Sequence, residues 1–183
     1  VAQMWLGGPV RGLVFYGGML AGLAATVYVL GTRKLSVLST LDILASVVPL
    51  AHAFGRIGCY LNGCCHGKIA AGGWAVRFPA RSQAWHAHVD AGRLSELADR
   101  SLPVIPAQLY AAAFNLALFG VLALLYRRRR WDGMVGVAYL LLYGLGRFNL
   151  ERWRGDARGY WMHLSLPQWI SLGLVAAGVI LGA

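Results

Sequence analysis

Five apolar stretches, each about as long as a bilayer is thick, constrain what this chain can fold into. A helix needs about 20 mostly apolar residues to cross the hydrocarbon core, and helices satisfy all their backbone hydrogen bonds internally. We therefore predict an all-α, polytopic transmembrane helical bundle that forms one integral membrane domain over residues 1–183. The predicted spans are approximately 12–31, 40–60, 107–126, 134–151 and 166–183.

Composition and charge agree with this interpretation. The chain is 58% hydrophobic and only 13% charged, whereas a soluble domain is nearer half apolar and a quarter charged. The formal net charge is +10, which in a soluble chain would indicate nucleic acid as a partner. In a membrane protein the expected counter-charge is membrane lipid with anionic headgroups, so no nucleic-acid partner is expected.

The basic residues of the short connections predict the topology. Arg33 and Lys34 follow the first span, and Arg127–Arg130 follow the third. The positive-inside rule places both connections in the cytoplasm, with the long polar loop 62–106 on the outer face. The chain begins at Val1 without a recognisable signal peptide, so we expect that upstream sequence is missing. Within the loop, residues 93–100 (RLSELADR) are predicted to form a short amphipathic helix.

The motif GRIGCYLNGCCHG, residues 55–67, places an arginine inside an apolar span. A charged side chain there is costly and needs a partner or a function. At 1.5 Å per residue, Arg56 lies about 24 Å along its span and Arg147 about 20 Å along another of the same direction. Both are therefore expected near the outer headgroup boundary. Six further polar residues are expected at that level: Tyr16, His52, Gln108, Tyr110, Glu151 and Arg154.

Two guanidinium groups at headgroup depth predict a phosphate site, because arginine offers a planar fork of donors that matches phosphate oxygens. Two structural explanations compete with this one. Both arginines can reach the interface by snorkelling, or Arg147 can simply pair with Glu151 one turn away. A further acidic residue, Asp42, ends the segment STLD (39–42), which we interpret mainly as a helix N-terminus with a capping acid.

Five motifs in order give the chain a family resemblance. They are VFYGG (14–18), LDILA (41–45), GRIGCYLNGCCHG (55–67), PAQLY (106–110) and YGLGRFNLERWRGD (143–156). In this order, and followed by a closing apolar span with PQW (167–169), the sequence resembles the bacterial prolipoprotein diacylglyceryl transferases over nearly its whole length.

The resemblance implies an activity. The family transfers a diacylglyceryl group from phosphatidylglycerol to the cysteine thiol of a prolipoprotein lipobox peptide, at the outer face of the bacterial inner membrane, with no cofactor or metal expected. It implies catalytic roles for Arg56, Arg147, Tyr16 and Glu151. It implies substrate binding by another set: Asn62, Gly63, Gly67, Gln108, Tyr110, Arg154 and Asp42.

The sequence also departs from the family pattern. Tyr16 and Ile105 stand where many members have histidine, so a histidine base is absent at both places. His52 and His66 are the candidate substitutes. These departures keep two alternatives open: a non-catalytic membrane protein that binds phospholipid or peptide on the same scaffold, and a transferase with a different acceptor.

The signature's usual asparagine and glutamate are replaced by Cys59 and Cys64, and Cys65 follows. We favour a disulfide from Cys59 to either of the others, because the outer face is oxidising. A metal site is less favoured, because adjacent cysteines do not match common zinc spacings such as CxxC. The remaining interpretation is small thiols without a role.

Overall fold

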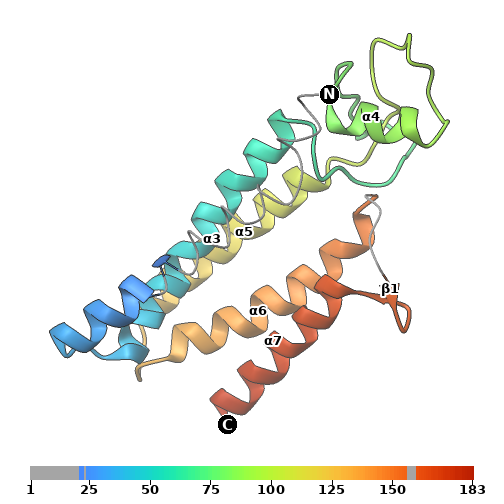
Figure 1. Ribbon diagram of the computed structural model, residues 1–183. Helices are drawn as coiled ribbons and strands as arrows, with labels where there is room; N and C mark the ends of the chain where they lie inside the picture. The colour runs from blue at the N-terminus through green and yellow to red at the C-terminus, as the bar shows by residue number, and fades with distance from the viewer. Residues whose placement is uncertain (1–20, 23, 156–159) are drawn as a thin grey trace. The chain divides into compact units, whose positions relative to one another are not determined.

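The computed structural model describes residues 21–22, 24–155 and 160–183. It divides into two compact units, 1–40 and 41–183, which are described separately. In the first unit, residues 21–22 and 24–33 are helical. The elements that position the site follow in chain order in Figure 1: α3 (Val37–Leu61), α4 (Gln83–Asp90), α5 (Ala107–Arg127), α6 (Met134–Leu150), the 3₁₀ turn η1 (Glu151–Trp153), β1 (Tyr160–Trp161), β2 (Leu164–Ser165) and α7 (Leu166–Gly182).

The prediction of an all-α chain is confirmed, with one short antiparallel hairpin as the exception. In the hairpin, Tyr160 pairs with Ser165 and Trp161 with Leu164. Two described helices, α3 and α5, are long and apolar enough to cross a membrane. Helices α6 and α7 have 17 residues each. The first predicted span, 12–31, lies partly outside the described residues.

Large apolar side chains remain exposed along these helices. Phe54 on α3 is 64% exposed, Leu124 on α5 61% and Ile180 on α7 75%. A soluble monomer rarely leaves so many large apolar groups in water, so these surfaces indicate a lipid environment.

Helices α6 and α7 run side by side in Figure 1 because small residues let their backbones approach. A Cβ added to Gly144 would lie 2.8 Å from a methyl of Val175 and 2.9 Å from the Ser171 carbonyl oxygen. A Cβ on Gly178 would lie 2.9 Å from the side chain of Leu141. Close contact through small residues is the usual means of helix association in lipid, and it fixes α6 against α7.

A buried carboxylate joins the start of α6 to α3. Helix α3 begins at Val37, three residues earlier than the STLD interpretation predicted, and the Ser36 hydroxyl accepts a hydrogen bond from Ser39 N at 3.3 Å. Asp42 is fully buried and accepts hydrogen bonds from three backbone N–H groups of 133–136, at 2.8–2.9 Å. Asp42 therefore caps α6 and not its own helix, next to an apolar cluster of Ala45, Leu118, Leu122 and Val135.

The loop 62–106 contains its own small core. Helix α4 begins after Ser82, whose hydroxyl accepts from Trp85 N. Ala84 of α4 packs with Phe78 and Val104. The prediction of a helix over 93–100 is wrong, because turns occupy this segment. Its backbone is held instead by the Trp85 indole N–H, which donates to the Ala98 carbonyl at 2.7 Å.

Candidate active site

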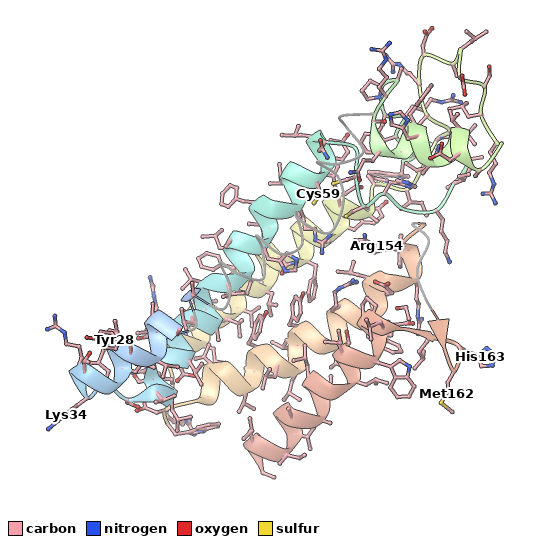
Figure 2. All side chains as sticks on the ribbon, viewed as in Figure 1. Tyr28, Lys34, Cys59, Arg154, Met162 and His163 are labelled. Carbon is pink, nitrogen blue, oxygen red and sulfur yellow. The ribbon has the colours of Figure 1, made fainter. Side chains whose placement is uncertain are left out.

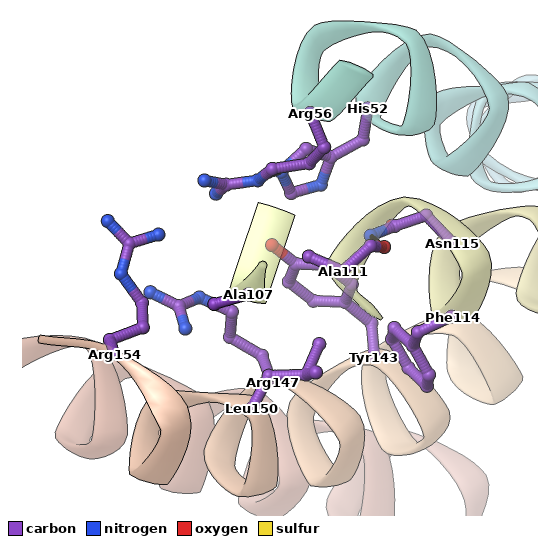
Figure 3. Close-up of a pocket in the computed structure, with 10 residues that line it drawn as sticks. All are labelled: His52, Arg56, Ala107, Ala111, Phe114, Asn115, Tyr143, Arg147, Leu150 and Arg154. Carbon is purple, nitrogen blue, oxygen red and sulfur yellow. Dashed lines mark hydrogen bonds between the residues drawn. The ribbon is translucent and has the colours of Figure 1, made fainter. Parts of the chain in front are cut away.

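A cavity that opens to solvent lies among α3, α5, α6 and the turn that follows α6. Figure 3 shows the guanidinium groups of Arg56, Arg147 and Arg154 directed toward the same space. Arg56 and Arg147 were predicted to lie at one level, and the structure brings both into one cavity. The complete lining is His52, Arg56, Ala107, Ala111, Phe114, Asn115, Tyr143, Arg147, Leu150 and Arg154.

Arg56 is oriented by the histidine one turn before it. Its Nε donates to His52 Nε2 at 3.2 Å. A nitrogen that accepts a hydrogen bond carries no proton, so in this arrangement the proton of the neutral imidazole is on Nδ1. The bond leaves the terminal nitrogens of Arg56 facing the cavity (Figure 3). It also occupies the lone pair that His52 would need to act as a base at that nitrogen.

Arg147 is held by Glu151 one turn further along. Its Nη1 lies 2.6 Å from Glu151 Oε2, and the two side chains are only 15% and 5% exposed. The other carboxylate oxygen, Oε1, accepts a hydrogen bond from the Ser165 hydroxyl at 3.1 Å. Ser165 is also the N-cap of α7. The start of α7 thus fixes Glu151, and Glu151 fixes Arg147.

The cavity is strongly cationic. Among the described residues that line it, the three with formal charge are arginines. Glu151, which does not line the cavity, forms an ion pair with one of them, Arg147. A low dielectric strengthens the attraction between these guanidinium groups and an anion. The arrangement suits an anion that accepts several hydrogen bonds from planar donors, as a phosphate does.

Two lining residues were missed by sequence reasoning. Asn115 on α5 is 2% exposed, and its Oδ1 has no partner among the described residues. A polar amide in the middle of an apolar span is a signal that sequence analysis can detect. Tyr143 lies within the YGLGRFNLERWRGD motif and stacks on Tyr139 at 5.2 Å between ring centroids. An aromatic residue in an apolar helix gives no such signal.

Gln108 and Tyr110, at the start of α5, lie beside the cavity without lining it. Gln108 is 1% exposed, and its Nε2 donates to the Cys64 carbonyl at 2.7 Å. It therefore ties α5 to the end of the GRIGCYLNGCCHG motif. Tyr110 makes an edge contact with Trp153 at 5.1 Å between ring centroids. Tyr110 and Trp153 line an adjacent apolar groove, together with Phe114, Gly146, Asn149 and Leu150.

The remaining predicted site residues are dispersed. Asn62 is exposed at the end of α3. Gly63 adopts φ +66° in the turn that follows, where a Cβ would lie 2.9 Å from Ser82. Asp42 does not line the cavity: it precedes Arg56 by 14 residues of α3, which is about 21 Å of helix. Tyr16 lies outside the described residues.

Gly67 lets two backbone segments pass close to each other. A Cβ there would lie 2.5 Å from the Ile105 carbonyl oxygen and 2.8 Å from that of Trp153. Gly67 also forms a bridge with Arg154, a cavity residue. Because glycine has no side chain, these backbone segments can pack closely enough to position Arg154.

Gly67→Ala is expected to lower the thermal midpoint of the protein in detergent by roughly 5–10 °C, because backbone atoms must move by several tenths of an ångström or more. Gly72→Ala is the matched control, since a Cβ at Gly72 meets nothing within 4 Å. Equal midpoints for the two variants would show that the close approach is unimportant.

His66, the second candidate base, does not line the arginine cavity. It is 6% exposed, and its Nδ1 lies 3.0 Å from the Gly67 carbonyl oxygen. Its ring is 5.4 Å from that of His88 on α4. Burial lowers the pKa of His88, and the neighbouring His66 and Arg93 lower it further.

His88 makes the loop core sensitive to acid. Its pKa is lower in the folded protein than in the unfolded chain, so the unfolded chain binds the proton more readily. The contribution of His88 to stability is complete above about pH 6.5 and is lost as pH falls through the lower folded pKa. We expect the melting temperature to fall on acidification, and His88→Gln to flatten that slope. His86→Gln, an exposed position on the same helix, should leave the slope unchanged.

These features together define a helical membrane protein with an arginine-lined cavity next to an apolar groove. The model of the prolipoprotein diacylglyceryl transferase family matches residues 1–183, and the chain belongs to that family.

Curated relatives agree. A phosphatidylglycerol–prolipoprotein diacylglyceryl transferase 2 of Clostridium perfringens is 32% identical, over 93% of this chain and 61% of the relative. The transferase of Clostridium tetani is 35% identical, over 92% of this chain and 62% of its own. The transferase of Burkholderia multivorans is 36% identical, over 99% of this chain and 65% of the relative. The chain thus spans just under two thirds of these relatives. No solved structure matches it.

Proposed function

We propose that the full-length protein transfers a diacylglyceryl group from phosphatidylglycerol to the cysteine thiol of a prolipoprotein. The observation that carries this proposal is the cavity into which Arg56, Arg147 and Arg154 converge. Snorkelling alone would direct each arginine to the nearest headgroup. Convergence of three guanidinium groups on one space instead suits a single phosphate.

The reaction needs such a cavity. A thiolate sulfur attacks the glycerol carbon of the lipid, the C–S bond forms, and the C–O bond to phosphate breaks. The electron pair leaves with glycerol phosphate, on which negative charge develops. Arg56 and Arg147 would stabilise that charge, since preorganised cations at a developing anion are among the largest catalytic effects. Glu151 would act as a positioning residue through its ion pair with Arg147.

The groove beside the cavity suits an acyl chain. It shares Phe114 and Leu150 with the arginine cavity, so a lipid with its phosphate on the arginines would have apolar walls within reach. We propose substrate contacts for Arg154, Tyr110 and Asn62. Gln108, Gly63 and Gly67 would hold the backbone around the site, and Tyr16 remains a candidate catalytic residue on the strength of the family motif.

We further propose a bacterial inner-membrane location, about five spans within one domain, and a site that opens toward the outer leaflet. Two features support this topology. The basic connection Arg127–Arg130 directly precedes α6, and positively charged short loops stay in the cytoplasm. Arg56 and Arg147 lie near the opposite, C-terminal ends of α3 and α6. The acceptor would be the lipobox peptide, with no nucleic-acid partner.

The test uses purified full-length protein, labelled phosphatidylglycerol and a lipobox peptide. We expect a thioether-linked diacylglyceryl peptide, and no product when serine replaces the acceptor cysteine or phosphatidylethanolamine replaces the lipid. Lipid that binds but is never transferred to any cysteine peptide would replace this proposal with the non-catalytic binding function.

A further inference from the structure

The three cysteines form a cluster that the proposed reaction has not yet used. The sulfur atoms of Cys59, Cys64 and Cys65 all lie within 4.8 Å of one another, and all three side chains are half-buried. None of the three forms a disulfide in the structure. Figure 2 places Cys59 near the end of α3 that enters the extramembrane loop. Among the described residues, these three cysteines are the one group of three or more potential metal ligands that lie close enough together to hold one ion.

The turn after α3 explains how adjacent cysteines come to share a site. Neighbouring side chains in an extended chain point in opposite directions. Here Gly63 and Cys65 both have positive φ, +66° and +58°, so the chain folds back on the helix end. Cys64 N donates to the Cys59 carbonyl at 3.1 Å, and Gln108 holds the Cys64 carbonyl from α5. This turn brings together three sulfurs whose sequence spacing does not match a common zinc motif.

We propose that Cys59, Cys64 and Cys65 bind one Zn²⁺ as thiolates and leave its fourth position to the acceptor thiol of the peptide. Three sulfurs on a tetrahedral zinc with bonds near 2.3 Å lie about 3.8 Å apart. In a cluster within 4.8 Å, the sulfurs need to approach one another by about 1 Å at most to reach that spacing. Three protein ligands with one open position are the arrangement of catalytic zinc, whereas structural zinc takes four.

The position of the cluster fits this use. Cys59 follows Arg56 by three residues on α3, so their Cβ atoms are separated by about 5–6 Å. Three thiolates and one Zn²⁺ carry a net charge of −1, and a fourth thiolate makes it −2. Arg56, which lines the phosphate cavity, offsets part of that charge. An acceptor thiolate on the zinc would therefore start beside the lipid phosphate site.

This inference rests on the proposed function, and its chemistry balances without a histidine base. The acceptor thiol loses its proton to solvent on coordination, because a zinc-bound thiol is deprotonated. Its sulfur attacks the glycerol carbon, the C–S bond forms, and the C–O bond breaks with the electron pair going to glycerol phosphate. Zinc does not change oxidation state.

Metal binding is tested first, on the reduced full-length protein with zinc or cobalt ions alone. We expect one equivalent of zinc, and sulfur-to-cobalt charge-transfer absorption when Co²⁺ replaces it. Each of Cys59→Ser, Cys64→Ser and Cys65→Ser should weaken zinc binding by more than the ~10–100-fold typical of a lost outer-shell partner. His86→Ala, an exposed histidine, should change nothing. Failure of the reduced protein to bind zinc, or equal binding by the triple serine variant, would overturn the proposal.

The open position is tested with the peptide. A lipobox peptide should shift the cobalt spectrum, and the same peptide with serine in place of cysteine should not. If the spectrum shifts but no thioether forms, the zinc site stands and the transfer function fails. If the triple serine variant, free of metal, forms the thioether at the rate of the unchanged protein, the transfer function stands and the zinc proposal is overturned.

Discussion

Arg147→Ala is expected to reduce the rate of diacylglyceryl transfer by about 10²–10³-fold, the loss typical when one charge-stabilising donor is removed from a reaction centre. Arg147 is held in the cavity by Glu151 at 2.6 Å, and the Ser165 hydroxyl in turn donates to Glu151. Arg147→Lys keeps the charge but loses the planar fork, so we expect an intermediate loss. Initial rates at saturating peptide and varied phosphatidylglycerol measure both.

The alanine variant needs controls for folding, because it leaves the buried carboxylate of Glu151 without its cation. Breaking such a pair costs about 3–5 kcal/mol. The double variant Arg147→Ala/Glu151→Gln removes the orphaned charge, so it should regain stability without regaining transfer. Arg152→Ala changes an exposed arginine of η1 that does not line the cavity, and it should transfer normally. A wild-type rate in Arg147→Ala would contradict the site.

The helices of this chain were predictable because their length and polarity are set by the bilayer. The segments predicted at 107–126 and 166–183 correspond to α5 (Ala107–Arg127) and α7 (Leu166–Gly182). Rise per residue along such helices then sufficed to place Arg56 and Arg147 at a common level. No knowledge of side-chain contacts was needed, because the positive-inside rule predicted that both helices start from the same face.

Contacts between elements were not predictable in the same way. The pattern of STLD indicated a capping acid but not which helix Asp42 would cap, since a carboxylate can serve any N-terminus that reaches it. The sequence separation of the cysteines gave no sign that a turn with two positive φ values would bring three sulfurs together. Asn115 was detectable as a polar residue in an apolar span, although only the structure shows which face it occupies.

A second variant, Asp42→Ala, is expected to destabilise the protein by about 3–5 kcal/mol, because it leaves several buried donors without an acceptor. Asp42 is fully buried, and it accepts from the N–H groups of Gly133, Val135 and Gly136 and lies 3.6 Å from Arg129. The melting temperature in detergent should fall by roughly 10 °C or more. The melting temperature of Asp42→Asn, which keeps one acceptor oxygen, should fall less.

Asp132 provides the matched control for this prediction. It lies 3.7 Å from the same Arg129, but its side chain is 48% exposed. Exposed ion pairs contribute about 0–1 kcal/mol to stability. The melting temperature of Asp132→Asn should therefore be close to that of the unchanged protein. The two variants also separate a structural from a substrate-binding role for Asp42. Below its melting temperature, Asp42→Ala should keep the KM for phosphatidylglycerol, since the cavity lies about 21 Å further along α3. A raised KM with an unchanged melting temperature would instead place Asp42 in the substrate site, and the capping bonds would then contribute little to stability.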